Sequence, residues 1–165
     1  MLDQIQQLLS DQIQGISLEP IPHSTPAGFI IPSANIHAVC ELLHSHPSCY
    51  FDHLACLSGV DDGVEANTME VVYTLYSIPH DVHLSLKVVL NRAYPEVASV
   101  CDIWRGANWH EREAYDLFGI QFSNHPDLRR ILLPADWVGF PMRKDYEEDT
   151  AYHGMTIKHP DVLKP

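Results

Sequence analysis

The chain has 165 residues, 45% of them hydrophobic, which is enough to bury the core of one domain. It carries 22 acidic and 10 basic residues, giving a formal net charge of −12. Nucleic acid and anionic lipid are poor partners for such a chain, because both are bound through cationic surfaces. The charge is also uneven: residues 1–86 hold ten acids and no Lys or Arg, whereas eight of the ten cations lie in 105–164. This asymmetry indicates two surfaces with different neighbours.

The chain shows no targeting signal at its N-terminus, and no apolar run approaches the ~20 residues of a membrane helix. Its cysteines form no C-x-x-C pair: Cys40, Cys49, Cys56 and Cys101. We expect them to be reduced thiols in or near the core. The sequence therefore predicts a soluble, cytosolic chain.

The N-terminal part predicts two helices. Residues 2–14 place Leu and Ile on one face, as an amphipathic helix does. A proline-rich connector leads to a short buried strand at residues 29–31. Ser33 is then in position to cap a helix over residues 34–44, whose inward face is expected to consist of Ile36, Val39, Cys40 and Leu43.

Three further strands follow, and Asp61-Asp62-Gly63 is typical of a turn between the first two. Their apolar alternation runs over residues 50–57, 69–76 and 83–90. Together these elements predict an α+β, two-layer fold with an antiparallel or mixed four-stranded sheet packed against helices. We assign this α+β domain to residues 1–103, where 97–100 is expected to form one helical turn.

The region 104–165 predicts a helix followed by an irregular docking segment. Residues 109–118 should be helical, with Asn108 as N-cap and Gly119 as left-handed C-cap. The region combines Trp, Tyr and Arg, which dominate the hot spots of protein interfaces. It lacks a phosphate-binding Gly loop, an activated nucleophile and a recognised metal-ligand spacing. This composition favours binding to another protein over catalysis.

The run from Glu111 to Leu132 resembles the signature of the 30 kDa-type subunit of respiratory complex I, the proton-pumping NADH:quinone oxidoreductase. The signature positions are met by Glu111, Arg112, Glu113, Asp116, Leu117, Phe118, His125, Arg129, Ile131 and Leu132. The continuation also matches, through Trp137, Gly139, Pro141, Arg143, Lys144 and Asp145. The close match covers about residues 104–146. One departure is Phe140-Pro141-Met142, where the family is expected to have His-Pro-Leu.

The resemblance implies an accessory subunit, without a redox cofactor of its own, in the hydrophilic arm of the complex. We also expect no metal site, because no carboxylate or cysteine lies at a recognised ligand spacing beside the histidines. Such subunits pack against the 49 kDa-type quinone-site subunit and near the iron–sulfur subunits, on the cytoplasmic side of the bacterial inner membrane. Iron–sulfur clusters, FMN and quinone are then held by partner chains, and this chain alone is not catalytic. The expected interface residues are Trp109, Glu111, Arg112, Glu113, Tyr115, Asp116, Phe118, His125, Asp127, Arg129, Arg130, Trp137, Arg143, Lys144 and Asp145.

Three alternatives remain open. The equivalent subunit of a ferredoxin:quinone complex or of a membrane-bound hydrogenase shares the signature. A free-standing metal hydrolase could use some of the eleven histidines, among them the His44/His46 and His80/His83 pairs. His125-Pro126-Asp127 is also the loop tripeptide of J-domain co-chaperones, although the helix before it is acidic here and basic there.

Overall fold

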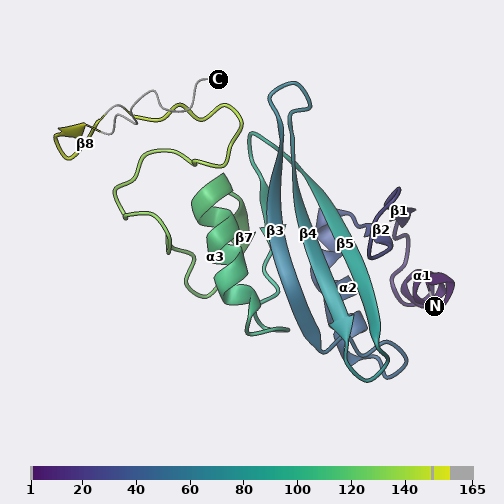
Figure 1. Cartoon of the computed structure of the whole chain (residues 1–165). Coiled ribbons are helices and arrows are strands. Elements are labelled where there is room, and N and C mark those ends of the chain that lie inside the picture. Colours follow the sequence, from purple (N-terminus) through teal and green to yellow (C-terminus); the bar gives the residue numbers. More distant parts are fainter. Residues whose placement is uncertain (1, 150, 157–165) are drawn as a thin grey trace.

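A computed structural model describes residues 2–149 and 151–156 of the chain (Figure 1). The first part contains, in chain order, α1 (Leu2–Gln12), β1 (Glu19–Pro20), β2 (Gly28–Ile30), η1 (Ser33–Asn35), α2 (Ile36–Ser45), β3 (His53–Gly63), β4 (Thr68–Ser77) and β5 (Val82–Asn91). The second contains β6 (Glu96–Ala98), α3 (Ala107–Phe118), β7 (Gln121–Ser123), β8 (Ala151–Tyr152) and β9 (Met155–Thr156). Within the described residues, no helix combines the length and apolarity needed to cross a bilayer.

The main sheet has five strands in the order β1-β2-β5-β4-β3. All neighbouring pairs are antiparallel except β2 and β5, so the sheet is mixed. Strand β2 approaches β5 so closely that a Cβ on Gly28 would lie 1.7 Å from the Ser85 carbonyl oxygen. The predicted α+β class is confirmed. The additional strand is the two-residue β1, which is too short to leave a periodic pattern in the sequence.

One face of the sheet is buried against the helices. Strand β4 buries alternate residues, and Tyr73 faces Leu86 while Leu75 faces Leu84 on β5. Figure 1 shows α2 behind β4 and β5, and α2 buries the four residues expected on its inward face, Ile36, Val39, Cys40 and Leu43. Fully burying one such aliphatic side chain stabilises the fold by about 1.5–3 kcal/mol. The predicted two-layer packing is therefore present.

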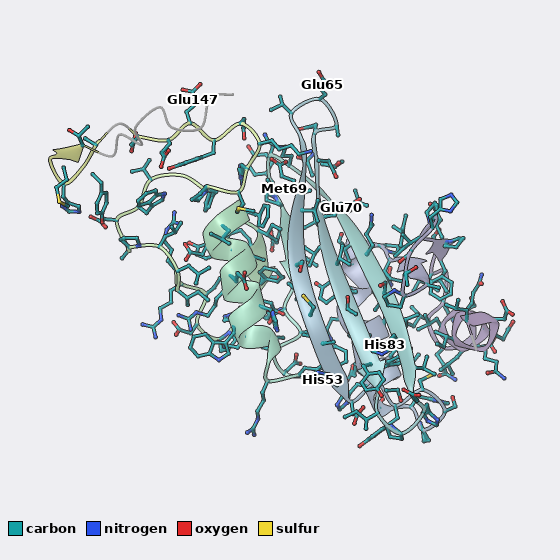
Figure 2. All side chains as sticks on the ribbon, viewed as in Figure 1. His53, Glu65, Met69, Glu70, His83 and Glu147 are labelled. Carbon is teal, nitrogen blue, oxygen red and sulfur yellow. The ribbon has the colours of Figure 1, made fainter. Side chains whose placement is uncertain are left out.

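The other face of the sheet remains partly exposed. Figure 2 shows the side chains of the strands, among them Glu70 on β4 and His83 on β5. The Glu70 carboxylate pairs with Lys87 Nζ at 2.7 Å, and the His83 ring stacks on Tyr76 with ring centroids 4.3 Å apart. This face thus carries local polar and aromatic pairs across β4 and β5.

Three local predictions are wrong. The turn predicted at Asp61-Asp62-Gly63 lies later, because β3 continues to Gly63 and buried Asp61 is paired with Arg92. Residues 96–98 form β6 and not a helical turn, because β6 pairs in parallel with β7. Ser33 begins a 3-10 turn, so the N-cap position of α2 falls on Asn35, and no side chain caps that helix.

Beyond β7 the chain forms what we call the C-terminal arm, residues 124–149 and 151–156 of the described chain. Figure 1 shows it running past α3 and away from the sheet to β8. Its only strands among the described residues are the two-residue β8 and β9, which pair with each other. The arm therefore depends on side-chain contacts for its position.

Candidate docking surface

Helix α3 carries the first part of the signature and packs against β3. It begins at Ala107, after Gly106, and no side chain caps its first turn. The predicted Asn108 N-cap is therefore wrong, because Asn108 already lies within the first turn. The predicted C-cap is confirmed: Gly119 adopts φ +77°, and its N–H donates to the Tyr115 carbonyl at 2.8 Å.

Glu111, a predicted interface residue, is fully buried inside this chain. One of its carboxylate oxygens accepts bonds from Ser99 Oγ at 2.6 Å and Cys101 Sγ at 3.2 Å, and the other accepts the Val100 amide at 2.7 Å. Burial raises the pKa of the Glu111 carboxyl, although these donors oppose the shift. Glu111 thus fixes the connection between β6 and α3 from inside this chain.

Asp116 is the second predicted interface residue that the chain buries completely. Its Oδ2 accepts the amides of three successive arm residues: Ile131 at 2.9 Å, Leu132 at 2.7 Å and Leu133 at 3.0 Å. Its Oδ1 accepts Arg130 Nη1 at 2.8 Å. Burial raises the pKa of Asp116, but the amides and Arg130 outweigh it, so the pKa lies below its usual range. This carboxylate holds the arm onto α3.

Arg130 and Arg143 also act within the chain. Arg130 Nη2 donates to the carbonyls of Gly139 at 2.9 Å and Trp137 at 3.2 Å, which fixes the turn between them. Arg143 Nε donates to the Phe118 carbonyl at the end of α3 at 2.7 Å. The two guanidinium carbons lie 5.3 and 4.8 Å from the Phe140 ring centroid. Phe140, which departs from the family pattern, therefore lies between two arginines.

A second attachment joins the arm to the hairpin of β3 and β4, and sequence reasoning missed it. Arg92 donates through Nε to Asp61 at 2.8 Å and also pairs with Asp145. Asp61 Oδ2 accepts the Lys144 amide at 2.8 Å. The Arg92 guanidinium holds the pKa of Asp61 far below its usual range. Figure 2 shows Glu65 at the hairpin tip and Glu147 on the arm at the same end of the molecule.

The remaining signature residues leave surface free for a partner. Trp109 is 63% exposed, and the Arg112 guanidinium carbon lies 5.1 Å from its ring centroid. Arg112 itself is mostly buried and donates through Nε to the Arg129 carbonyl at 3.2 Å. Arg129 pairs with Asp127 at 2.9 Å, and both side chains are largely exposed. We call the exposed signature residues, together with the exposed apolar residues Val138 and Met142, the candidate docking face: Trp109, Glu113, Asp127, Arg129, Leu132, Val138 and Met142.

Six further predicted interface residues belong neither to the residues that hold the arm onto α3 nor to the candidate docking face. Tyr115, Phe118, His125 and Trp137 are partly buried, and Lys144 and Asp145 are exposed at the hairpin attachment. The Trp137 ring lies 5.5 Å from the Tyr152 ring, and its buried Nε1 has no hydrogen-bond partner among the described residues. The structure therefore separates residues that position the arm from residues that α3 and the arm expose.

The histidine pairs of the hydrolase alternative have local partners. His44 stacks edge-on against Trp104 with centroids 5.6 Å apart, and His46 Nδ1 lies 2.7 Å from Ser48 Oγ. His80 Nε2 lies 3.1 Å from the Pro47 carbonyl, and His83 stacks on Tyr76. These pairs do not gather into a ligand group within residues 2–149 and 151–156. One other group does gather there: Cys101, Glu111 and His125.

The remaining chemical hypotheses also find little support. Burial raises the pKa of Cys101 to about 12 and that of Cys40 higher still, so these thiols stay protonated near neutral pH and are poor nucleophiles. His125-Pro126-Asp127 follows the strand β7 and not a helix. The J-domain arrangement, in which the tripeptide joins two helices, is therefore wrong for this chain.

Comparison with known proteins identifies a family and several similar chains. Residues 29–152 match the family "Respiratory-chain NADH dehydrogenase, 30 Kd subunit". The chain is 48% identical over 122 residues to an NADH-quinone oxidoreductase subunit of Chlorobium phaeobacteroides, covering 73% of each chain. It is also 48% identical over 110 residues to an F(420)H(2) dehydrogenase subunit of Methanosarcina mazei, covering 66% of this chain and 68% of that one.

Solved structures show the same fold. A trypsin-resistant fragment of Nqo5 (1-134) superimposes with a TM-score of 0.60 at 28% identity, covering 77% of this chain and 98% of the fragment. A chain of an archaeal membrane-bound sulfane sulfur reductase gives a TM-score of 0.70 at 20% identity, covering 88% and 85%. The chain spans only 50% of an NADH-quinone oxidoreductase subunit of Chloroherpeton thalassium, to which it is 48% identical over 123 residues. The family match, over most of the chain, shows that this protein belongs to the 30 Kd subunit family of respiratory-chain NADH dehydrogenase.

Proposed function

We propose that this chain is an accessory subunit of a proton-translocating NADH:quinone oxidoreductase and that it docks through the face displayed by α3 and the arm. One observation carries the proposal. The chain uses buried Asp116 and its partner Arg130 to hold an arm with little secondary structure, while Trp109 on α3 and Arg129 on the arm stay exposed. Fixing an exposed aromatic and a cation in advance lowers the entropy lost on binding. Such an arrangement suits a permanent contact with another subunit.

The expected partners are the 49 kDa-type quinone-site subunit and the iron–sulfur subunits, in the hydrophilic arm on the cytoplasmic side of the membrane. The proposed contribution of this chain is assembly and rigid placement. Redox cofactors belong to the partner chains in this proposal, and turnover requires them. The proposal is supported by family membership and by the raised pKa values of the buried thiols, which leave no activated nucleophile among Cys40, Cys49 and Cys101.

The electron donor defines the second candidate function. A relative named as a subunit of F(420)H(2) dehydrogenase is as similar to this chain, at 48% identity, as a relative named as a subunit of NADH-quinone oxidoreductase. The same docking role therefore suits a complex with another donor, such as a ferredoxin:quinone complex or a membrane-bound hydrogenase. Identification of the donor-binding subunit that co-purifies with the chain would separate these candidates.

The test is affinity purification of the tagged chain from membranes of a cell that makes the complex but lacks its own copy of this subunit. Low salt should be used, because exposed charge pairs are screened. Trp109→Ala should reduce the recovered quinone-site subunit by at least about tenfold, since exposed Trp anchors are frequent hot spots. Arg129→Ala should reduce it less.

Ile78→Ala is the matched control, because Ile78 is 59% exposed but lies in the turn between β4 and β5. It should leave recovery unchanged. Circular dichroism of each purified variant verifies that it is folded. Full recovery with both Trp109→Ala and Arg129→Ala would contradict docking through this face.

A further inference from the structure

Cys101, Glu111 and His125 bring three different ligand groups together at the base of the arm. One ligand atom from each residue lies within 4.8 Å of the other two. Cys101 lies between β6 and α3, Glu111 on α3, and His125 just after β7. Their positions in the sequence gave no sign of a site, because the spacings of ten and fourteen residues match no common ligand motif.

We propose that these three side chains form a binding site for a soft divalent transition metal, with Zn²⁺ as the expected ion. A thiolate, an imidazole and a carboxylate are all zinc ligands, whereas Mg²⁺ and Ca²⁺ require oxygen ligands. The mixed ligand set therefore selects the class of ion. It is a different set from the surface histidine pairs considered in the sequence.

The distances are close to those that zinc needs. Zinc bonds of about 2.3 Å to sulfur and about 2.0–2.2 Å to oxygen and nitrogen place tetrahedral ligand atoms about 3.5 Å apart. Cys101 Sγ already lies 3.2 Å from Glu111 Oε2, and the group as a whole lies within 4.8 Å. Small side-chain movements are therefore enough to close the group around an ion.

The charges also balance. On binding, Cys101 loses its thiol proton to solvent, and bonds from the metal to sulfur and oxygen replace the S–H···O contact with Glu111. A thiolate and a carboxylate together cancel the charge of a divalent ion, with His125 neutral. Neutrality matters here because Glu111 is fully buried, and an uncompensated buried charge is costly. The ion would leave no net charge at the site.

Neighbouring groups hold the ligands in place. Glu111 retains its bonds from Ser99 Oγ and the Val100 amide, which keep the carboxylate oriented. The His125 ring accepts the Asp127 amide at Nδ1 (3.0 Å), and its Nε2 lies 3.4 Å from the Asn108 carbonyl. A metal at Nδ1 displaces the Asp127 amide and leaves the Nε2–H in place to donate to the Asn108 carbonyl, whereas a metal at Nε2 removes both contacts, because a neutral ring then carries its proton on Nδ1. Binding through Nδ1 therefore costs less, since Asp127 is exposed to water.

The site is reachable from solvent. Cys101 lines a cavity of about 620 Å³, together with Ser99 and the neighbours of His125, Asn124 and Pro126. Three protein ligands leave the fourth position of a tetrahedral zinc to water or to a group that enters this cavity. A bound ion would join the β6–α3 connection, α3 and the start of the arm. Metal binding is thus expected to make the start of the C-terminal arm more rigid.

Cobalt titration of the reduced, full-length chain tests the proposal, because Co²⁺ occupies zinc sites and reports its ligands by absorption. One equivalent of Co²⁺ should produce thiolate-to-cobalt charge-transfer absorption and tetrahedral visible bands, and Zn²⁺ should abolish both. Cys101→Ser should remove the charge-transfer band. Cys56→Ser is the matched control, since Cys56 lies on β3 with Sγ 3.2 Å from Ser58 Oγ, and it should retain the band.

His125→Asn should weaken Co²⁺ binding by at least about tenfold. Glu111→Gln should do the same where circular dichroism shows that it is folded, and Cys101→Ser keeps the test decisive if Glu111→Gln does not fold. Co²⁺ binding without the charge-transfer band would show that the ion binds surface histidines and not Cys101, which would overturn the proposal. A band that survives Cys101→Ser would overturn it as well. None of these readouts depends on docking to a partner.

Discussion

Two buried carboxylates of the signature, Asp116 and Glu111, each hold a neighbouring segment of the chain by several hydrogen bonds. Asp116 accepts three arm amides and one arginine through two oxygens, all without exposure to water. Hydrogen bonds to a charged, buried acceptor are stronger than those between neutral groups. Glu111 accepts Ser99 Oγ and the Val100 amide and so holds the segment before α3. At the residue scale these acids stabilise this chain's own fold, whereas Trp109 and Arg129 stay exposed.

Asp116→Ala should lower the free energy of unfolding by about 3 kcal/mol or more. The substitution leaves the Arg130 guanidinium without its carboxylate and three arm amides without their acceptor, and breaking a buried pair from one side is strongly destabilising. Urea denaturation followed by circular dichroism measures the change. Asp127→Ala is the control, because the Asp127–Arg129 pair is largely exposed and such pairs contribute about 0–1 kcal/mol. Equal effects of the two substitutions would contradict the assigned role of Asp116.

At the element scale, most of the sheet and helices could be predicted from the sequence. Residues 69–76 and 83–90 alternate because one face of β4 and β5 is buried, and α2 shows its apolar stripe for the same reason. The end of β3 could not be predicted, because Asp61 suits a strand only when Arg92 lies beside it. That pairing joins residues 31 positions apart, and local patterns carry no information about it.

The candidate site shows the same limit. The signature identifies which residues matter, but spacing does not reveal whether a side chain points into its own fold or toward a partner. Arg130 and Arg143 have the chemistry of interface cations, yet both donate to carbonyls of this chain. Arg130 and Arg143 point into this chain because the Gly139 carbonyl and the end of α3 lie within their reach in the folded structure.

The junction between α3 and the arm depends on Gly119. Its φ of +77° is unfavourable for other residues, and an added Cβ would lie 2.6 Å from the Phe140 ring and 2.8 Å from Arg143 Nη2. Gly119→Ala should therefore cost about 1–2 kcal/mol for the backbone alone and also displace Phe140. Limited proteolysis should cut the arm faster in this variant than in the unmodified chain.

Gly106→Ala is the control for that change. Gly106 has φ −63°, and an added Cβ there would meet no atom within 4 Å. The cost should stay within about 1 kcal/mol, as expected for a replaced N-cap residue. If the arm of Gly119→Ala resists proteolysis as well as that of Gly106→Ala, the close approach of Phe140 does not hold the arm.

At the scale of the whole molecule, two separate attachments keep the arm in place. Asp116 and Arg130 hold its first part to α3, and Arg92 holds Asp145 while it pairs with Asp61 on the hairpin. Removing the second attachment should free the end of the arm without opening the sheet, because β4 and β5 are held by their own ladder and core. Local opening of this kind is visible in amide hydrogen exchange.

Arg92→Met should raise amide exchange in residues 141–149 by at least about tenfold while β4 and β5 stay protected. Arg105→Met, at an exposed cation before α3, applies the same substitution and should leave the arm protected.

In the unmodified chain, the contribution of Asp61 to the free energy of unfolding is present above the usual carboxyl pKa, because the pKa of Asp61 is lowered in the folded state. Stability should therefore decline as the pH falls below about 4, and the decline should be shallower in Arg92→Met, where Asp61 has lost its cation. Urea denaturation between neutral and acidic pH measures both slopes, and identical slopes would show that Arg92 does not lower the pKa of Asp61.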